Sequence, residues 1–157
     1  MHDNALRVQA ALKARGLSIT VVELEKSTRT SRDAAEAIGT TVAQIAKSLV
    51  FEAGDRPVLV IASGTNRVSE EKLTRIFGSE VRMAGASAVK AATGFSIGGV
   101  PPIGHSSDLE ILIDDDLLHF DHLWAAAGTP NAVFPISPER LVAITDGTVA
   151  DIKEDER

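Results

Sequence analysis

The sequence predicts an α/β chain of the α+β type, in which a curved mixed β-sheet or a partly closed barrel is covered by several short helices. The clearest strand signal is Val58–Ala62, which is wholly apolar and therefore typical of a central strand. The predicted helices are short, bounded by capping residues and glycines, and they do not alternate regularly with the strands. A doubly wound fold, which needs such alternation, therefore fits poorly.

Length and composition predict one globular domain spanning residues 1–157. With 44% hydrophobic and 24% charged residues, the chain can bury one sizeable core. The absence of cysteine excludes a disulfide framework, a zinc cluster held by cysteines and a cysteine nucleophile. His119 and His122 could share a helix face, but no third ligand stands at a telling spacing. We therefore expect no metal and no other cofactor.

Charge and hydropathy narrow the range of partners and locations. The net charge of −6 argues against a broad basic surface for nucleic acid, although it leaves room for a local basic pocket. The first residues lack the basic region and apolar core of a secretory signal, and no apolar run is long enough to span a bilayer. We therefore expect a cytoplasmic protein without a membrane partner.

The first third of the chain predicts two helices and a strand. Asp3 can cap a helix that ends at Gly16, because a short polar side chain suits the first position and glycine the last. Ile19–Leu24 is rich in β-branched residues and predicts a strand. Thr30 stands three residues before an aspartate, which is capping-box spacing, and opens a second helix that ends at Gly39.

Lys47 is the first candidate functional residue. Thr41 and Gln44 have capping-box spacing and predict a short helix, which runs directly into the apolar strand that begins with Lys47 and ends at Phe51. Desolvating an ammonium in such a strand is costly unless it meets an anion or an acceptor. The alternative is that the lysine side chain extends along the apolar surface and keeps its charge in water.

The remaining elements follow from similar signals. Asp114–Asp116 could hold a divalent cation, but without alternating ligand spacing these acids are expected to cap the next turn. We expect helices at 70–77, 87–93 and from Ser137 to Gly147, strands at 80–83, 110–113 and 149–152, and hairpin loops at 53–57 and 128–131.

Gly94–His105 is the second candidate site. Four of its twelve residues are glycine and two are adjacent prolines, so backbone stands where side chains would normally stand. Gly98 and Gly99 can therefore present bare N–H groups to a ligand. The alternative is a tight turn between two elements, because glycine and proline mark ordinary loops as well.

Four motifs, taken in order, make the chain resemble the YbaK/ProX family. Members of this family are aminoacyl-tRNA deacylases related to the editing insertion of bacterial prolyl-tRNA synthetase. The resemblance covers almost the whole chain and implies the fold of that family. The motifs are Thr28–Gly39, Gln44–Val50, Gly94–Gly104 and Ala126–Gly128.

The resemblance assigns roles to particular residues. Lys47 matches the lysine that is the functional signature of the family, and Ser48 falls where members carry Thr, Ser or Asn beside the aminoacyl group. Gly98 and Gly99 match the glycines that line the pocket near the ester. The full set of implied substrate-binding residues is Thr30, Ser48, Gly98, Gly99, Ala126, Gly128 and Asn131.

The resemblance implies hydrolysis, in trans, of the ester between an amino acid and the 3′-terminal ribose of a mischarged tRNA. The catalytic residues implied are Lys47, Gly98 and Gly99. Backbone N–H groups of the two glycines suit a developing oxyanion, and each such donor contributes about 3 kcal/mol in enzymes that use it. Lys47, as an ammonium, could orient the terminal phosphate or the carbonyl group. Either water or the neighbouring ribose hydroxyl could attack.

Partners and specificity are further expectations. A protein that holds only the 3′ end of aminoacyl-tRNA could obtain its remaining tRNA affinity from prolyl-tRNA synthetase or another synthetase. The cysteine-specific branch of the family has a serine near the position of Ala126 and an acid near Val133, and this chain has neither. We therefore expect a small substrate such as alanine or serine, in translation quality control. The alternatives are a non-catalytic module that binds a tRNA end or a synthetase, and a small-molecule esterase.

Overall fold

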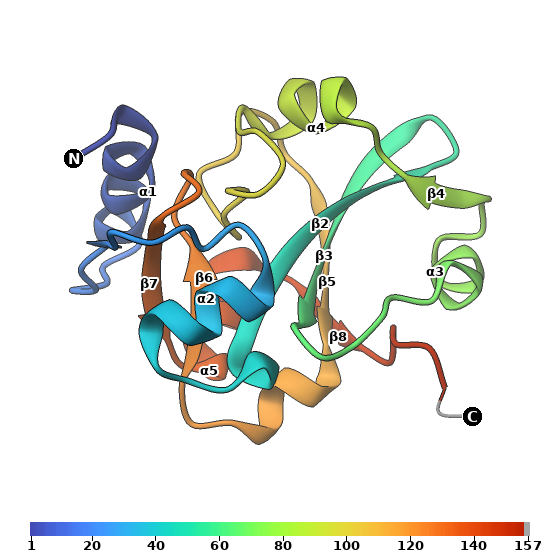
Figure 1. Ribbon diagram of the computed structural model, residues 1–157. Helices are drawn as coiled ribbons and strands as arrows, with labels where there is room; N and C mark the ends of the chain where they lie inside the picture. The colour runs from blue at the N-terminus through green and yellow to red at the C-terminus, as the bar shows by residue number, and fades with distance from the viewer. Residues whose placement is uncertain (156–157) are drawn as a thin grey trace.

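The computed structural model describes residues 1–155 and contains one open, eight-stranded mixed sheet (Figure 1). The strands follow the order β1-β7-β6-β2-β3-β5-β8, and β4 pairs separately with β2. The predicted curved mixed sheet is confirmed, and its ends do not meet to form a barrel. The strands are β1 (Val22–Glu23), β2 (Ile45–Ala53), β3 (Arg56–Ser63), β4 (Val81–Met83), β5 (Glu110–Asp114), β6 (Leu123–Ala126), β7 (Ala132–Ile136) and β8 (Thr148–Ala150).

The helices begin and end mainly where local capping predicts. The hydroxyls of Thr30, Ser69 and Ser137 each accept a backbone N–H from the first turn of the helix that follows. Asp3, however, is not the cap of the first helix: His2 accepts the N–H of Asn4 through Nδ1 at 3.0 Å, and Asp3 lies in the first turn. The helices are α1 (Asp3–Ala14), α2 (Ser31–Ile38), α3 (Glu70–Phe77), α4 (Ala86–Thr93) and α5 (Pro138–Thr145), with 3-10 turns η1 (Val42–Gln44) and η2 (Asp115–His119).

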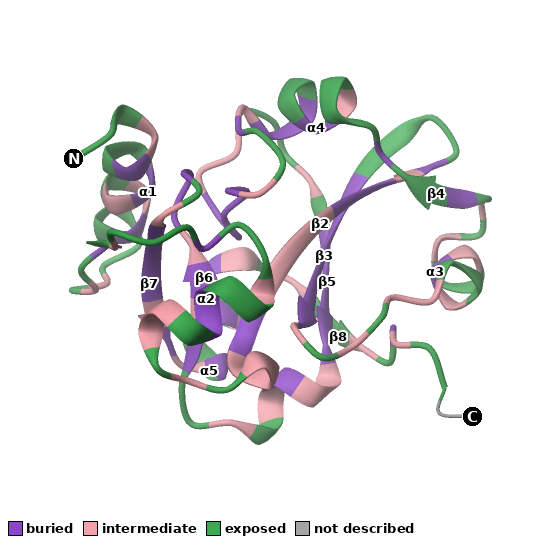
Figure 2. Cartoon of the chain, viewed as in Figure 1, coloured by how far each residue is buried: buried purple, intermediate pink, exposed green. Residues whose placement is uncertain are grey.

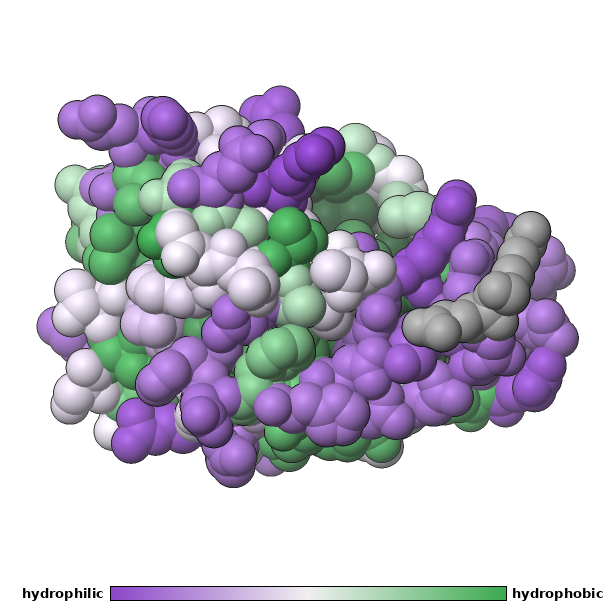
Figure 3. Space-filling view, turned by 60° about the horizontal axis from the view of Figure 1, so that its bottom comes forward, coloured by the Kyte–Doolittle hydropathy of each residue, from purple (hydrophilic) through white to green (hydrophobic). Residues whose placement is uncertain are grey.

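Two hydrophobic cores cover the two faces of the β2–β3 hairpin. Successive side chains of a strand point to opposite faces, so Val50 joins the larger core whereas Phe51 joins the smaller one. The larger core includes Leu12 of α1 and Phe134 of β7, and the smaller includes Leu73 of α3. Buried residues accordingly follow the central strands in Figure 2, and hydrophilic side chains cover most of the face shown in Figure 3.

Two predicted elements differ in the structure. The strand expected at 19–24 is reduced to β1, because the side chain of Gln9 bonds the carbonyl of Ile19 and the N–H of Val21 in place of a neighbouring strand. The helix expected after Thr41 is the single turn η1, and β2 begins at Ile45. Lys47 therefore lies inside a strand rather than at a helix-to-strand junction. No helix within residues 1–155 is both long and apolar enough to cross a membrane.

Candidate functional site

A cavity of about 560 Å³ lies over β2, between α2 and the glycine-rich loop. Its walls come from residues 28–31 at the start of α2, from 45–50 of β2, from 97–100 of the loop and from 124–126 of β6. The cations Lys47 and Arg29 are in this lining, and no aspartate or glutamate is, although the chain has 22 acidic residues. The local charge is thus opposite to that of the whole protein and favours an anionic ligand.

Six of the eight predicted site residues lie together in this lining, and their catalytic and binding roles stay predictions. The structure does not bring Gly128 and Asn131 into the lining. The side chain of Asn131 instead donates to the carbonyl of Leu24 at 2.8 Å and so ties the β6–β7 loop to the segment that precedes α2. The six that line the cavity are Thr30, Lys47, Ser48, Gly98, Gly99 and Ala126.

The ammonium of Lys47 is half-buried and held in place. Lys47 pairs with Ala62 across β2 and β3, and its Nζ donates to the carbonyl oxygen of Asn66 at 2.7 Å. Burial lowers the pKa of Lys47 below its ordinary value, and the carboxylate of Asp114 opposes that shift. Lys47 is therefore not an unpaired buried charge, because it has an acceptor, and it is not fully solvated either, because it is half-buried. It is a partly desolvated cation with one fixed acceptor. The residue lines this cavity and also a neighbouring one, whose lining includes Glu70, Glu71, Glu154 and Asp155.

Asp114, the last residue of β5, favours the charged form of Lys47 and bonds Asn66, whose carbonyl oxygen accepts from the lysine. It is fully buried, and its carboxylate accepts the N–H of Ser63 at 2.9 Å and the side-chain amide of Asn66 at 2.8 Å. It also accepts the N–H of Asp116 at 3.0 Å, which caps η2. The capping role predicted for the acidic triplet is therefore confirmed at Asp114. Asp116 accepts from Lys153 at 2.7 Å, and this hydrogen bond is the main cause that lowers the pKa of Asp116.

The glycine-rich loop brings backbone close to two neighbours. Gly98 has φ +94°, and a Cβ there would lie 2.7 Å from Cγ of Arg29, so the arginine stem lies directly on this glycine. A Cβ at Gly99 would lie 3.0 Å from the backbone of Thr129. The Gly128 N–H donates to the Gly99 carbonyl at 2.9 Å, which joins the two loops.

Only one of the two glycines offers a free donor. The N–H of Gly99 donates to the carbonyl of Ser96 at 3.2 Å, so it is not the bare group that the sequence predicted. The N–H of Gly98 has no hydrogen-bond acceptor within residues 1–155. This donor, next to the guanidinium stem of Arg29, is the one that the loop can present to a ligand.

Several lining residues were not singled out from the sequence. Arg29 lies within the first motif. Its packing on Gly98 could not be predicted, because the two residues are far apart in the sequence. Met83 and Ile97 are the most exposed large hydrophobic residues of the described chain, with 58% and 55% of their surface accessible, and both line the cavity. They form an apolar rim beside the cations.

Comparison with known proteins gives consistent findings. Residues 25–144 match the family model described as the aminoacyl-tRNA editing domain. The chain is 37% identical over 122 residues to the uncharacterized protein YwhH of Bacillus subtilis, covering 77% of this chain and 78% of that one. A solved structure described as a proposed trans-editing enzyme for prolyl-tRNA synthetase superposes with a TM-score of 0.94 at 47% identity, over 99% of each chain.

Two more distant relatives have names that specify a tRNA or an amino acid. The chain is 26% identical over 120 residues to EbsC of Enterococcus faecalis, named as a proposed Cys-tRNA(Pro)/Cys-tRNA(Cys) deacylase, over 75% of this chain and 73% of that one. It is 30% identical over 92 residues to the proline–tRNA ligase of Thermoanaerobacter sp. strain X514. That match covers 57% of this chain and only 16% of the ligase.

Proposed function

The chain belongs to the aminoacyl-tRNA editing domain family, and on that premise we propose that it hydrolyses, in trans, the ester between a small amino acid and the 3′-terminal ribose of mischarged tRNA. The observation that carries this proposal is the charge of the cavity. Lys47 and Arg29 line it without any carboxylate, in a protein whose net charge is −6. A site of this kind suits the phosphate next to the terminal adenosine, since cations in a partly desolvated cleft bind anions more strongly than they would in water.

The reaction needs positioning and charge stabilisation more than it needs an acid or a base. Water adds to the ester carbonyl and loses a proton, the bond to the 3′-oxygen breaks, and that oxygen takes up a proton as the free amino acid is released. If the neighbouring ribose hydroxyl attacks first, the acyl group moves to that oxygen, and water then cleaves the new ester. The free N–H of Gly98 is suited to donate to the carbonyl oxygen as it becomes negative. Lys47, fixed by Asn66, holds the nucleotide so that the ester lies beside this donor.

The lining favours a small amino acid. The bulky Trp124 lines the β6 wall together with Ala125 and Ala126, which carry no side-chain hydrogen-bonding group, and Ser48 is the small polar residue beside Lys47. A wall of this kind selects by volume, and one methylene changes selectivity by only about 1–3 kcal/mol. Alanyl and seryl esters are therefore expected to be cleared at comparable rates, and the bulkier prolyl ester to be spared.

A synthetase is the proposed partner for the rest of the tRNA. The net charge of the chain is −6, which argues against a broad basic surface for the phosphates of an acceptor stem. One solved structure similar to this chain is described as a proposed trans-editing enzyme for prolyl-tRNA synthetase. We propose that the substrate is tRNA-Pro carrying the wrong amino acid, presented by that synthetase.

A deacylation panel tests this function. The purified protein is incubated with tRNA-Pro charged with alanine, serine, cysteine or proline, with and without prolyl-tRNA synthetase, and release of the amino acid is timed. The proposal predicts hydrolysis of the alanyl and seryl esters and sparing of the prolyl ester. Rapid loss of correctly charged prolyl-tRNA, or cysteinyl ester turning over far faster than both small esters, contradicts the proposed specificity. No hydrolysis of any ester indicates a non-catalytic module.

A further inference from the structure

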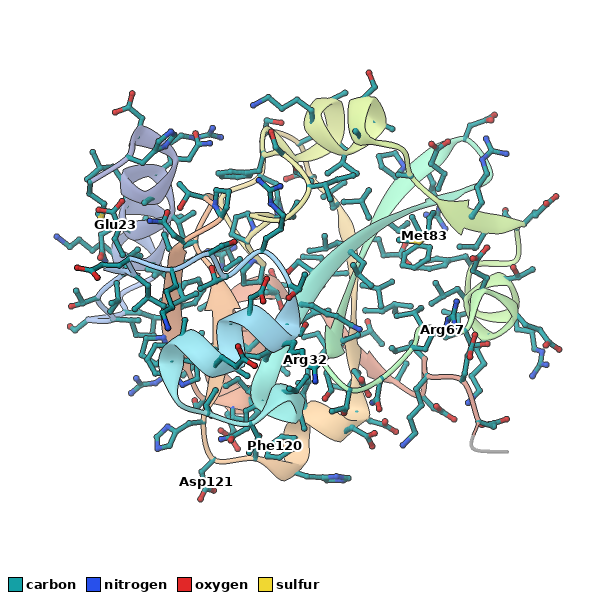
Figure 4. All side chains as sticks on the ribbon, in the orientation of Figure 1. Glu23, Arg32, Arg67, Met83, Phe120 and Asp121 are labelled. Carbon is teal, nitrogen blue, oxygen red and sulfur yellow. The ribbon has the colours of Figure 1, made fainter. Side chains whose placement is uncertain are left out.

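The outer edge of β2 is unpaired at its centre. On this edge β6 pairs with Ile45 and Ala46 and reaches no further, whereas β4 begins to pair only at Phe51. The Val50 carbonyl accepts the N–H of Ala84 at 3.1 Å, which closes the gap from the β4 side. Figure 4 labels Arg32 on α2 and Met83 on β4, the two elements that flank this stretch. Between them, Ser48 faces the cavity without a neighbouring strand.

The strand register points the backbone of Ser48 outward. The N–H of Gly64 donates to the carbonyl of Ile45, so the polar groups of Ile45 face β3. In an antiparallel pair these groups alternate in direction from one residue to the next. Those of Lys47 therefore face β3 as well, and the N–H and C=O of Ser48 face the open edge.

The side chain of Ser48 adds a third unpaired polar group. Its hydroxyl oxygen is buried and has no hydrogen-bond partner within the described residues, 1–155. Buried polar atoms of native proteins are nearly always paired, so such an exception calls for an explanation. Ser48, which lines the cavity, thus has a backbone donor and a backbone acceptor at the open edge of β2. Its unpaired hydroxyl lies on the face of β2 opposite to the Lys47 side chain.

This arrangement matches the polar groups of an aminoacyl ester. The esterified amino acid has a donor, its α-amino group, and an acceptor, its carbonyl oxygen, on either side of one Cα. These are the groups that a residue uses to pair with a strand edge. A simple alkyl ester, in contrast, offers the acceptor alone.

We propose that Ser48 binds the aminoacyl group as a one-residue extension of the sheet. Its carbonyl oxygen and hydroxyl accept the α-amino group, and its N–H donates to the ester carbonyl, beside the donor of Gly98. The inference rests on the proposed function and adds to it that the free α-amino group is required. It also makes Ser48 a residue that distinguishes aminoacyl esters from other esters.

Substrates that lack the α-amino group test the inference. Deacylation of alanyl-tRNA is compared with that of lactyl-tRNA and N-acetylalanyl-tRNA by the wild type and by Ser48→Ala, with Ser87→Ala on the exposed face of α4 as the control. We expect kcat/KM of the wild type and the control to fall by about tenfold or more when the amine is replaced or blocked, as for the loss of a hydrogen bond to a charged group. In Ser48→Ala this ratio is expected to shrink severalfold. Equal rates on all three esters overturn the inference while leaving the deacylase function intact.

Binding gives a readout that does not depend on turnover. A hydrolysis-resistant analogue, 3′-alanylamido-adenosine, is titrated while the amide signals of the protein are followed by NMR and hydrogen exchange. We expect the Ser48 amide to shift and to become protected, and 3′-propionylamido-adenosine, which lacks the amine, to bind about tenfold more weakly. A Ser48 amide that stays unshifted and unprotected at saturation contradicts the proposal. This result is distinct from a failure of the deacylation panel, which concerns the proposed function itself.

Discussion

The ammonium of Lys47 and the backbone carbonyl of Asn66 are joined by a 2.7 Å hydrogen bond. Asn66 lies in the loop after β3, and its side-chain amide donates to the carboxylates of Asp114 and Asp116 at 2.8 Å each. The position of the charge therefore depends on the ends of two strands that are far apart in sequence. A lysine held in this way can meet a phosphate without first having to be ordered.

Asp114 is expected to stabilise the fold as well as the site. Asp114→Ala would leave the Ser63 N–H without its acceptor, would leave the Asn66 amide with Asp116 as its remaining acceptor, and would remove the buried charge facing Lys47. We expect the free energy of unfolding to fall by about 3–5 kcal/mol, as when one partner of a buried charged network is removed. Urea denaturation measures this, with Asp121→Ala, an exposed acid, as the control. A loss equal to that of the control would mean that Asp114 contributes no net stability.

His105 is expected to make stability dependent on mildly acidic pH. Its Nε2 lies 2.7 Å from the carbonyl of Pro101, and burial lowers the pKa of His105 below its ordinary value of 6.5, more than this hydrogen bond raises it. The folded state therefore binds fewer protons than the unfolded state. The stabilising contribution is present above pH 6.5 and is lost as the pH falls through the lowered pKa.

The melting temperature of His105→Gln tests that dependence. Glutamine does not titrate and can still donate to Pro101, so its melting temperature is expected to fall less than that of the wild type when the pH is lowered from 7.5 to 5.5. The effect of the exposed carboxylates is common to both proteins. Parallel pH profiles would show that the histidine does not titrate as proposed.

Gly128 is expected to be required for packing beneath the site. It has φ +93°, and a Cβ there would lie 2.9 Å from the backbone oxygen of Asn4 and from the ring of Phe95. Gly39 has φ +86°, and a Cβ there would meet no atom within 4 Å, so it provides a matched control for the backbone strain alone. We expect Gly39→Ala to cost about 1 kcal/mol and Gly128→Ala at least 1–3 kcal/mol more. Similar losses by thermal denaturation would show that the loop shifts to accept a methyl group.

Arg29 is expected to contribute to substrate binding rather than to chemistry. Its side chain lies on Gly98, and within residues 1–155 its guanidinium makes no ion pair. Arg29→Ala should raise KM for aminoacyl-tRNA by about tenfold with little change in kcat, because a phosphate contact is lost equally in ground and transition states. It should also reduce the salt dependence of kcat/KM by roughly one phosphate contact. Arg15→Ala, at the end of α1, serves as the control, and a fall in kcat alone would assign Arg29 to the chemical step instead.

The sequence predicted those features that depend on neighbouring residues. The cap at Thr30 was correct because a capping hydrogen bond joins residues three positions apart, and the helices expected at 70–77 and from Ser137 are capped in the same way by Ser69 and Ser137. The motifs also identified six residues that the structure gathers in one cavity, among them Lys47 and Gly98. Their spacing in the chain did not predict that these residues lie in one site. That expectation came from the resemblance to the family.

The sequence could not predict features that depend on distant contacts. The strand after α1 is short because the side chain of Gln9 forms hydrogen bonds with the backbone of Ile19 and Val21. The β-propensity of a segment does not predict a contact of this kind. The Gly99 N–H is already bonded, and Lys47 has its acceptor in another loop. The open edge of β2 at Ser48 likewise follows only from where β6 and β4 stop pairing.

Single-turnover release of alanine from alanyl-tRNA-Pro by Lys47→Met tests the central claim most directly. Methionine keeps most of the apolar stem and removes the charge, so we expect the fold to survive with a loss of about 1–3 kcal/mol in unfolding free energy. Lys13→Met, on the exposed face of α1, is the matched control for the loss of a cation. If Lys47 orients the nucleotide, the rate falls by about 100-fold or more in Lys47→Met and stays unchanged in Lys13→Met. Release of alanine at the wild-type rate by folded Lys47→Met would contradict the account.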